Sequence, residues 1–488
     1  IAVLSVDDRW LRGQAESLMA ASTPPLTLRR LDDVQLRLKD VIFKQTEAKA
    51  RAAEAQEQMK DMLAAVTALQ QAIDRRELIW VYGDYDVDGS TAAALLVEFL
   101  RAWGAQVDYY IPHRIDEGYG LHAAALEEAK KAGVGLLLTV DCGVTAVAEA
   151  QLARELGLQL VITDHHEPKG ALPSATAVVN PRQPGCPYPC KQLAGVGVAF
   201  KLAQAFALVN EGFTEASVEL PKQFRLLLAD ALDLVALGTI ADVVPLVGEN
   251  RFLVAVGLQR LAETGRPGLR ELIKVAGLGG SELTAGKVAF GLAPRLNAAG
   301  RMGDPRDSVR LLLTTDHAEA RRLATALDRA NRERQRLEEA LVSELEARVW
   351  ASPELRQAYF PVLAGEGWHP GIIGIVAARL VERFHRPVAV VSLDPATGEG
   401  RGSVRSISGY NVFAALDENG ELFLRYGGHA QAAGFVVAGS RVPAVQEALE
   451  RHARARLTAE DLRGRAQADA VVVLPDIDER LVTELSQF

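Results

Sequence analysis

Gly83-Asp84-Tyr85-Asp86-Val87-Asp88-Gly89 places three carboxylates at alternate positions between two apolar segments. Residues 78–82 before it have the apolar composition of a buried strand, and residues 90–101 after it open with small side chains typical of a packed helix. Three like charges this close raise one another's pKa unless cations neutralise them. The stretch therefore predicts a divalent-metal site at the carboxyl end of a strand, where open α/β sheets bind their ligands.

Three other interpretations of this acidic turn are weaker. An EF-hand loop also begins Asp-x-Asp-x-Asp-Gly, but its twelfth position is a bidentate Glu and here it is Leu95. A phosphatase with a nucleophilic Asp on a strand-end turn is the chemical alternative. The third interpretation is a solvated acidic turn with no function, and the further polar groups at strand ends along the chain make this interpretation less favoured.

The size and composition indicate several folded domains without a membrane span. A chain of 488 residues exceeds one ordinary core, so two or three domains are expected. No apolar run reaches the length of a membrane-spanning helix. The three cysteines are too few for a disulfide framework, which favours a reducing, cytoplasmic location. The net charge of −9 argues against bulk attraction to nucleic acid, so such a partner needs a local basic groove or bound metals.

Strands and helices alternate after the acidic turn. Further strands are expected at 107–111, 136–140, 160–163 and 177–179, and the helices between them end at glycine. This alternation predicts a parallel sheet covered by helices on both faces. Asp141 follows one of these strands and Asp164-His165-His166 another, so their side chains are expected to meet the acidic turn at one edge of the sheet.

A mostly helical region, residues 195–256, carries two more carboxylates of interest. Asp233 interrupts the largely apolar run 226–237, and a carboxylate in such a place is paired, protonated or bound to metal. Asp242 is a weaker second candidate, since a hydrogen bond at a helix end or turn accounts for it as well.

Composition divides the chain into five segments. Residues 1–76 are an N-terminal arm and helical region, 77–314 the strand–helix domain, 315–352 a charged connecting helix, 353–462 a smaller domain, and 463–488 the start of another domain. Loops of the smaller domain place glycines beside His369, Ser403, Arg405 and His429, a composition that suits close approach of backbone to a phosphate.

The ordered motifs resemble those of the DHH phosphoesterase superfamily. Asp84-x-Asp86-x-Asp88-Gly89, Asp141-Cys142-Gly143, Asp164-His165-His166 and Asp233 are similar to its four motifs. Further stretches resemble the single-strand-specific 5′ exonucleases of the superfamily, and these stretches lie at 111–114, 117–120, 238–242, 294–301, 369–374, 403–406 and 426–429. The resemblance runs from about Arg76 to the end. Such exonucleases usually continue into an oligonucleotide-binding barrel, so we expect a nuclease core without that domain.

The resemblance implies an α/β fold, with a parallel-sheet DHH domain joined by a long helix to a smaller α/β DHH-associated domain and an active-site groove between them. It implies a 5′-to-3′ exonuclease that hydrolyses single-stranded DNA to mononucleotides with two metal ions, in DNA repair and recombination. Single-stranded DNA with a 5′ end is the implied partner, with a single-strand-binding protein and a helicase as possible protein partners and no membrane.

The same resemblance implies roles for individual residues. The metal ligands would be Asp84, Asp86, Asp88, Asp141, His165 and Asp233, with Asp141 bridging two ions. His166 would contact the phosphate or the leaving oxygen. The implied catalytic residues are Asp86, Asp88, Asp141, His165, His166 and Asp233. Oxygen and imidazole ligands without thiolate indicate Mn²⁺, with Mg²⁺ as the alternative.

Substrate-binding residues are implied in the same way. A pocket for the 5′-phosphate would include Arg114, Arg295, Ser403 and Arg405, because the planar guanidinium group of Arg binds phosphate through two hydrogen bonds. The groove would be lined by Asn297, Arg301, His369 and His429.

Two alternative functions stay open at this point. One is a DHH phosphodiesterase that acts on short RNA or cyclic dinucleotides. The other is a catalytically inactive DHH relative that serves as a scaffold, which the presence of a side chain at every ligand position disfavours.

Overall fold

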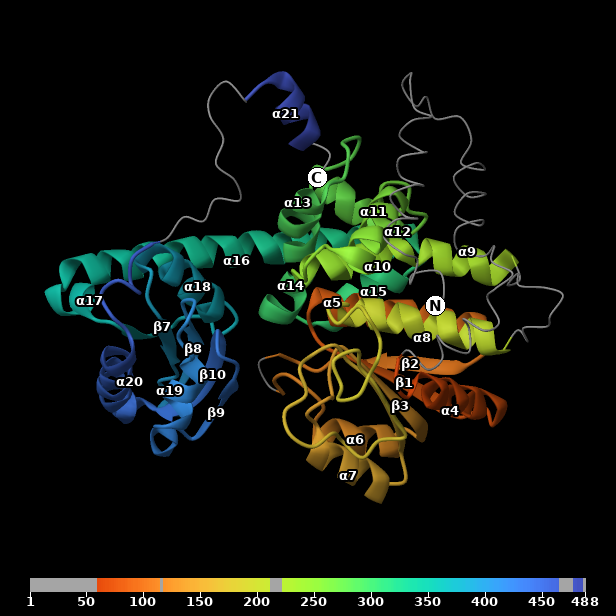
Figure 1. The fold of residues 1–488 in the computed structure, drawn as a ribbon, viewed down its shortest axis with the longest axis horizontal. Coiled ribbons are helices and arrows are strands. Elements are labelled where there is room, and N and C mark those ends of the chain that lie inside the picture. Colours follow the sequence, from red (N-terminus) through yellow and green to blue (C-terminus); the bar gives the residue numbers. More distant parts are fainter. Residues whose placement is uncertain (1–58, 115–116, 211–221, 465–476, 486–488) are drawn as a thin grey trace. The chain divides into compact units, whose positions relative to one another are not determined.

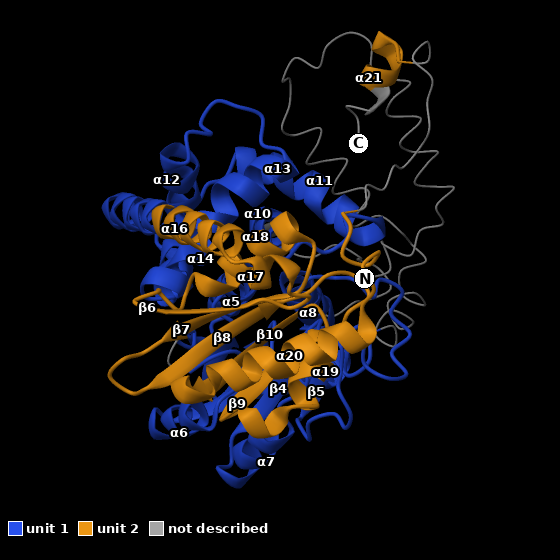
Figure 2. Ribbon diagram, turned by 90° about the vertical axis from the view of Figure 1, so that its left-hand side faces the viewer, with its two compact units in different colours: residues 1–335 blue, residues 336–488 orange. Residues whose placement is uncertain are grey.

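The computed structural model describes residues 59–114, 117–210, 222–464 and 477–485 (Figure 1). The chain divides into two compact units, Ile1–Gln335 and Arg336–Phe488 (Figure 2). Residues 1–58 of the predicted N-terminal region and residues 465–476 of the predicted last segment lie outside the described residues. Within those residues, no helix has both the length and the apolar sequence needed to cross a lipid bilayer.

The first unit is built on a five-stranded parallel sheet, which confirms the predicted parallel arrangement. Its strands pair in the order β2-β1-β3-β4-β5. Their bounds are Leu78–Gly83 (β1), Gln106–Tyr110 (β2), Val134–Val140 (β3), Gln159–Thr163 (β4) and Ala177–Val179 (β5). The strand order reverses direction between β1 and β3, and a crevice opens at such a point beyond the carboxyl ends of the strands.

Helices cover both faces of this sheet (Figure 1). One face packs against α4 (Met62–Asp74), α5 (Val87–Ala102) and α8 (Gly195–Asn210), and the other against α6 (Ala123–Lys131) and α7 (Val147–Glu155). Side chains alternate along each strand, so Ile79 and Val81 of β1 join the first core while Tyr82 joins the second.

Helix α5 begins three residues earlier than the sequence suggests. Its cap is Asp86, whose Oδ1 accepts a hydrogen bond of 3.0 Å from the Gly89 amide. The second half of the acidic stretch is therefore the first helical turn, because an Asp at the N-cap satisfies an amide that would otherwise lack a partner.

A helical layer follows the sheet. It contains α9 (Lys222–Asp230), α10 (Leu232–Ala241), α11 (Gly248–Ala262), α12 (Pro267–Val275), α13 (Ala285–Lys287), a π-helical turn (Val288–Leu292), α14 (Ala293–Met302) and α15 (Arg306–Leu313). Helix α10 is buried from Leu232 to Ile240 and packs against α5, α8 and α11. Glycine allows this close packing: a Cβ on Gly238 would lie 2.3 Å from Oγ1 of Thr91, and one on Gly257 would lie 2.3 Å from the carbonyl oxygen of Leu232.

The long charged helix predicted at 315–352 is α16, His317–Ala351. The boundary between the two compact units falls within it. Ion pairs along its surface include Arg332 with Asp328, four residues apart at 2.8 Å, a spacing that supports a solvated helix.

The second unit is a smaller α/β domain, as predicted. Its strands pair in the order β6-β7-β8-β10-β9, with only β6 and β7 parallel. The strands are β6 (Val362–Glu366), β7 (Val388–Leu393), β8 (Glu399–Arg405), β9 (Arg425–Gly428) and β10 (Ala432–Ala438). Helix α18 (Ile373–Phe384) contacts β7 and β8, while α19 (Val412–Asp417) and α20 (Val442–Arg456) pack with the core that contains Phe435. Short elements are α17 (Pro353–Gln357), two 3₁₀ turns (Gly420–Leu422 and Gly439–Arg441) and α21 (Glu479–Leu485).

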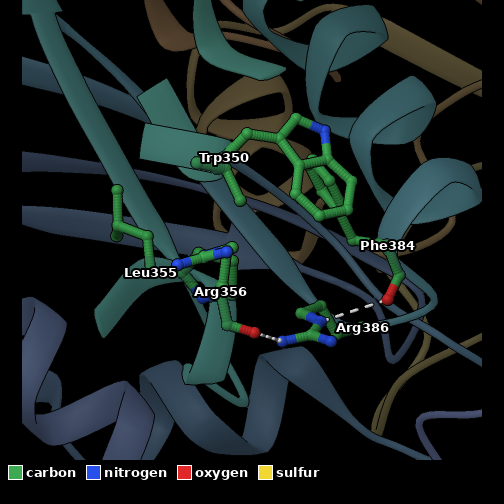
Figure 3. A pocket seen from close by; sticks show the side chains of 7 residues that line it. Trp350, Leu355, Arg356, Phe384 and Arg386 are labelled. Atoms are coloured by element: carbon green, nitrogen blue, oxygen red, sulfur yellow. Dashed lines mark hydrogen bonds between the residues drawn. The ribbon is translucent and has the colours of Figure 1, made fainter. Parts of the chain in front are cut away.

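Arg386 connects three backbone segments near the start of this unit through hydrogen bonds (Figure 3). Its guanidinium donates hydrogen bonds to the carbonyl oxygens of Phe384, Arg356 and Ala358 at 3.1, 3.0 and 2.6 Å. Trp350, at the end of α16, packs edge to face on Phe384, with ring centroids 6.2 Å apart. These contacts connect the ends of α16, α17 and α18 around a small pocket that Trp350, Leu355, Phe384 and Arg386 help to line.

Candidate metal centre

The turn after β1 presents three carboxylates to one small region. Asp84 follows the strand, Asp86 caps α5 and Asp88 lies in its first turn. The turn can close this tightly because Gly89 has no side chain: a Cβ there would lie 2.5 Å from the amide nitrogen of Asp84. Both oxygens of Asp88 accept backbone amides at the start of α8, from Gly195 at 2.6 Å and Val196 at 2.8 Å, so its carboxylate is fixed in position.

Asp141, after β3, is held in an unusual backbone conformation. Its φ is +60°, in the left-handed region that residues with a side chain rarely adopt. Gly195 packs directly on it, and a Cβ on Gly195 would lie 2.7 Å from the Cβ of Asp141. The side chain of Asp141 is therefore buried and aimed at the acidic turn, and backbone strain of this kind is found most often at functional sites.

Asp164, after β4, organises the two histidines that follow it. One oxygen accepts the amides of His165 at 2.7 Å and His166 at 3.1 Å and lies 2.8 Å from His166 Nδ1, and the other accepts the Val144 amide at 2.9 Å. Asp164 belongs to the Asp-His-His motif, but no role for it follows from the sequence alone. The sequence feature that points to Asp164 is its position directly after a strand. Its function as a hydrogen-bond acceptor depends on the geometry of the loop.

His165 joins these strand ends to the end of α10. Its Nε2 lies 3.1 Å from Asp141 Oδ1, 3.6 Å from Asp242 Oδ2 and 3.8 Å from Asp88 Oδ2. Among the described residues, three overlapping groups have ligand atoms within 4.8 Å of one another, and these are Asp84–Asp86–Asp141, Asp88–His165–Asp242 and Asp141–His165–His166. The structure thus brings together six of the predicted site residues, with Asp242 as a seventh member.

The structure corrects the prediction for Asp233. Both of its oxygens lie 3.1 Å from Arg266 Nε, and Thr264 Oγ1 donates to it at 2.7 Å. Asp233 lies in the first turn of α10 and Asp242 caps its last, so about 13 Å of helix rise separates them. Asp233 therefore cannot share a coordination sphere with the cluster that contains Asp242. Arg266 also donates to Glu98 of α5 at 2.6 Å, and the ion pair fastens α10 to α5.

Without cations, ionisation of the carboxylates in this cluster is unfavourable. Burial, and then repulsion from neighbouring carboxylates, raises the pKa of Asp84, Asp88 and Asp141 well above the usual value. Burial and the charge of Asp86 raise the pKa of Asp242 to about 7. Burial lowers the pKa of His165 to about 3, so its imidazole is neutral at pH 7. Divalent cations relieve this repulsion, because they favour charged carboxylates and neutral imidazole.

Hydrogen bonding supports the same conclusion. Asp84 Oδ1, Asp141 Oδ1 and His165 Nε2 are buried and make no hydrogen bond with the described residues. Buried polar atoms without a partner are costly and call for an explanation such as a bound ion. The donor set of hard oxygens and imidazole, without thiolate, fits divalent ions such as Mn²⁺ or Mg²⁺.

His166 is electrostatically different from His165. Burial disfavours its charged form, but the hydrogen bond and the negative charge of Asp164 outweigh burial and raise the pKa of His166 to about 9. Tyr119 Oη lies 3.1 Å from the same Nδ1. His166 therefore stays protonated at neutral pH, and its side chain is about one-third exposed at the edge of the cluster.

The basic residues predicted in the first unit lie around Tyr85 and on α14. The Arg114 guanidinium lies over the Tyr85 ring at 4.7 Å. Arg295 donates to Asp328 at 2.9 Å and also to the Gly291 carbonyl, which leaves its outer edge partly exposed. Asn297 and Arg301 are on the same helix, α14, whose Gly300 packs against the backbone of Tyr85.

In the second unit, Arg405 and Ser403 lie together beside the start of α18. Arg405 Nη1 donates to Ser403 Oγ at 3.1 Å. A Cβ on Gly374 would lie 3.0 Å from both side chains, so glycine is needed for the helix to approach them. His369 precedes this helix, with its Nδ1 accepting the Gly371 amide at 3.1 Å, and His429 lies in the β9–β10 turn. The predicted groove between the domains stays a prediction.

Two domain matches define the class of the protein. Residues 78–239 match the DHH family, N-terminal domain, and residues 356–455 match the DHHA1 domain. The sheet that carries the acidic cluster and the smaller α/β unit are thus the two domains of a DHH–DHHA1 protein, which confirms the resemblance seen in the sequence motifs.

Whole-chain similarity identifies the family. The single-stranded-DNA-specific exonuclease RecJ of Bacillus subtilis (strain 168) is 43% identical over 429 residues, which cover 88% of this chain and 52% of that protein. RecJ of Dickeya dadantii (strain 3937) is 39% identical, over 85% of this chain and 73% of that protein. The crystal structure of exonuclease RecJ bound to manganese matches with 40% identity and a TM-score of 0.71, over 82% of this chain and 96% of the other. The chain belongs to the RecJ family, and it spans about half the length of the Bacillus subtilis relative.

Substitution of the two carboxylates at the ends of α10 distinguishes a ligand from a structural ion pair. We expect Asp242→Asn to weaken Mn²⁺ binding more than about tenfold without loss of stability, because it removes a ligand with a raised pKa. We expect Asp233→Asn to cost roughly 3 kcal/mol of unfolding free energy, because it removes the buried partner of Arg266 and leaves only the more exposed Glu98, while Mn²⁺ binding changes little. Calorimetric titration with Mn²⁺ and urea unfolding measure the two effects. Loss of metal binding in a fully stable Asp233→Asn protein would return Asp233 to the ligand set.

The raised carboxyl pKa values predict how metal-free stability depends on pH. In the folded state Asp242 holds its proton up to about pH 7, whereas an unfolded Asp releases it near pH 4. The folded protein thus binds more protons between these values, and its stability falls as pH rises through the window. In EDTA, we expect Asp242→Asn to abolish this loss, which is roughly 4 kcal/mol for a pKa difference of about three units. Mn²⁺ should raise Tm more at about pH 8 than at about pH 5, because the carboxyl protons bound at pH 5 compete with the ion, whereas at pH 8 the ionised carboxylates bind it directly. A Tm increase independent of pH would argue against metal binding at these carboxylates.

Proposed function

We propose that this chain is the catalytic core of a 5′-to-3′ exonuclease that hydrolyses single-stranded DNA to mononucleotides. The observation that carries the proposal is the position of His165 Nε2 within 4 Å of oxygens of Asp88, Asp141 and Asp242. A buried acidic cluster of this kind suits two-metal hydrolysis of a phosphodiester. The family relatives named single-stranded-DNA-specific exonuclease supply the substrate class.

Two groups of side chains would each hold one divalent ion. Asp84 and Asp86 form one group with Asp141, and Asp88 and Asp242 form the other with His165. Asp141 Oδ1 lies 3.1 Å from His165 Nε2 and so connects the two groups, which suits the bridging role. Bound ions at such a site supply Lewis-acid stabilisation of phosphate charge and lower the pKa of water. The neutral imidazole favours Mn²⁺ over Mg²⁺, and the related RecJ structure was solved with manganese.

His166 is suited to protonate the leaving 3′ oxygen. The hydrogen bond from its Nδ1 to Asp164 holds the ring in place and its pKa near 9, so the ring carries a transferable proton at neutral pH. Arg114, stacked on Tyr85, would offset the phosphate charge beside the acidic cluster. The chain's own contribution is thus to place a protonated imidazole and a guanidinium around a negatively charged metal-binding site.

Recognition of the 5′ end would use the basic groups of both units. Ser403 and Arg405 lie beside the start of α18, which Gly374 allows to approach them closely, and these two side chains would bind the phosphate together with amides of that helix start. Arg114 and Arg295 of the first unit are further candidates for contact with a phosphate, and Asn297, Arg301, His369 and His429 for contact with the strand. In DNA repair and recombination, a helicase and a single-strand-binding protein would supply and cover such a strand.

The decisive experiment is degradation of a 5′-phosphorylated, 3′-labelled single strand in Mn²⁺. We expect ordered shortening from the 5′ end, with mononucleotides as product, and no degradation of blunt duplex. Asp141→Asn serves as the inactive control, because loss of the connecting carboxylate should reduce kcat by about a thousandfold or more. Preference for cyclic dinucleotides or short RNA would support the alternative phosphodiesterase. Binding without any turnover in Mn²⁺ or Mg²⁺ would support an inactive scaffold.

A further prediction separates end recognition from chemistry. Arg405→Ala should raise KM for 5′-phosphorylated DNA about tenfold or more with little change in kcat, because a charge-assisted hydrogen bond to a non-reacting phosphate is lost. The matched control is Arg451→Ala, which removes an exposed guanidinium from α20 in the same unit. A fall in kcat at constant KM would place Arg405 in the chemical step.

A further inference from the structure

The proposed function leaves one large cavity unused. It lies at the β2 edge of the first sheet and has a volume of about 580 Å³. Its walls come from β1 and β2, the segment after β2, α6 and the start of α15. This volume is in the range of sites for small ligands. The cavity shares no lining residue with the acidic cluster.

A row of stacked aromatic rings forms one end of the cavity. Tyr82 stacks on Tyr110 at 5.4 Å and Tyr110 stacks on Trp80 at 5.6 Å, with planes inclined by 9° and 23°. The row exists because Trp80 and Tyr82 face the same side of β1 and Tyr110 is in register with Tyr82 on β2. Tyr82 is fully buried, whereas Trp80 and Tyr110 are half-buried and line the cavity. The row therefore offers an aromatic surface that a further planar ring can extend.

Carboxylates border these rings. Glu117 accepts a hydrogen bond of 2.8 Å from Tyr110 Oη and one from the His113 amide, so its position and that of the ring are fixed. The side chain of Glu128, on α6, is exposed and makes no hydrogen bond or ion pair with the described residues. Acceptors beside an aromatic surface suit a planar ring that carries amino groups, which is the chemistry of a nucleobase.

The opposite wall, at the start of α15, carries an arginine that is paired with a neighbouring carboxylate. Arg306 forms a two-fold contact with Asp304, from Nε to Oδ1 at 2.9 Å and from Nη2 to Oδ2 at 2.6 Å. The side chain of Arg306 remains exposed, and His113 lines the cavity nearby. A guanidinium and an imidazole in this position suit the phosphate of a nucleotide.

We propose that this cavity binds one nucleotide, with its base extending the Trp80–Tyr110 row and its phosphate beside Arg306 and His113. The nucleotide can come from two sources, a free mononucleotide or one unit of a single strand. The segment that follows β2 connects this cavity to Arg114, which lies on Tyr85 of the acidic turn. The identity of the ligand rests in part on the proposed function, because the exonuclease would act on a strand of such units and release them.

Binding to metal-free protein tests this proposal independently of catalysis. The probes are dAMP, dCMP, adenosine, inorganic phosphate and a short 5′-phosphorylated oligonucleotide, each titrated in EDTA with binding followed by calorimetry. We expect both mononucleotides to bind more tightly than adenosine or phosphate alone, because each half of the ligand contacts one end of the cavity. Trp80→Leu and Arg306→Ala should each weaken binding about fivefold or more.

Matched controls locate the binding site. Arg310→Ala removes an exposed guanidinium from the same helix without touching the cavity, and it should leave binding unchanged. Arg306 is exposed, so its variant remains informative if Trp80→Leu fails to fold. If only the oligonucleotide binds, with the same dependence on Arg306, the site takes its nucleotide from a strand.

Two outcomes would overturn the proposal. One is the absence of binding by every nucleotide probe, and the other is binding that Arg405→Ala abolishes while Arg306→Ala leaves it intact. Because no metal or turnover is involved, the exonuclease can fail its own test while this site passes, and the reverse also holds.

Discussion

Repulsion among buried carboxylates is the constraint on which the first unit depends. Asp84, Asp88 and Asp141 are each less than 5% exposed, and one oxygen of Asp84 and one of Asp141 accept no hydrogen bond from the described residues. A protein keeps such a cluster only if the surrounding structure holds it in place and a cation neutralises it. Rigid support is visible in the two α8 amides on Asp88, the left-handed backbone at Asp141 and the glycines that allow close packing.

The supporting elements also carry charges that are fully paired, and this contrast is informative. The Asp233–Arg266–Glu98 group joins α10 to α5 at the ends far from the cluster. Gly238 lets the same two helices meet beside Asp88 and Thr91 at the near ends. Asp88 on α5 and Asp242 on α10 are thus held by one antiparallel helix pair fixed at both ends. The paired carboxylate, Asp233, stabilises the packing of the two helices. The carboxylates without a cationic side-chain partner, Asp88 and Asp242, are the ones suited to bind a cation.

The two histidines show how position alone separates chemical roles in neighbouring residues. His165 lies among carboxylates but is deeply buried, so burial keeps it neutral and able to coordinate a cation. His166 is only one residue further, yet its direct hydrogen bond to Asp164 keeps it protonated. The same divergence of pKa values between adjacent groups commonly distinguishes ligands from proton donors.

The amino-acid sequence was sufficient to predict the alternation of strands and helices, the parallel sheet and the positions of Asp84, Asp86, Asp88, Asp141 and His165 at or just after strand ends. These features follow from local periodicity and from the rule that parallel strands end at a common edge. Only the tertiary structure decided between Asp233 and Asp242, because both lie on one apolar helix and its direction relative to the sheet is set by long-range packing. The same is true of Asp164, whose role is to accept four hydrogen bonds within a folded loop, and of the Trp80–Tyr110 row, which exists only through strand register. Contacts between segments distant in the chain carry no local signal, and for that reason the polar partners had to be seen in three dimensions.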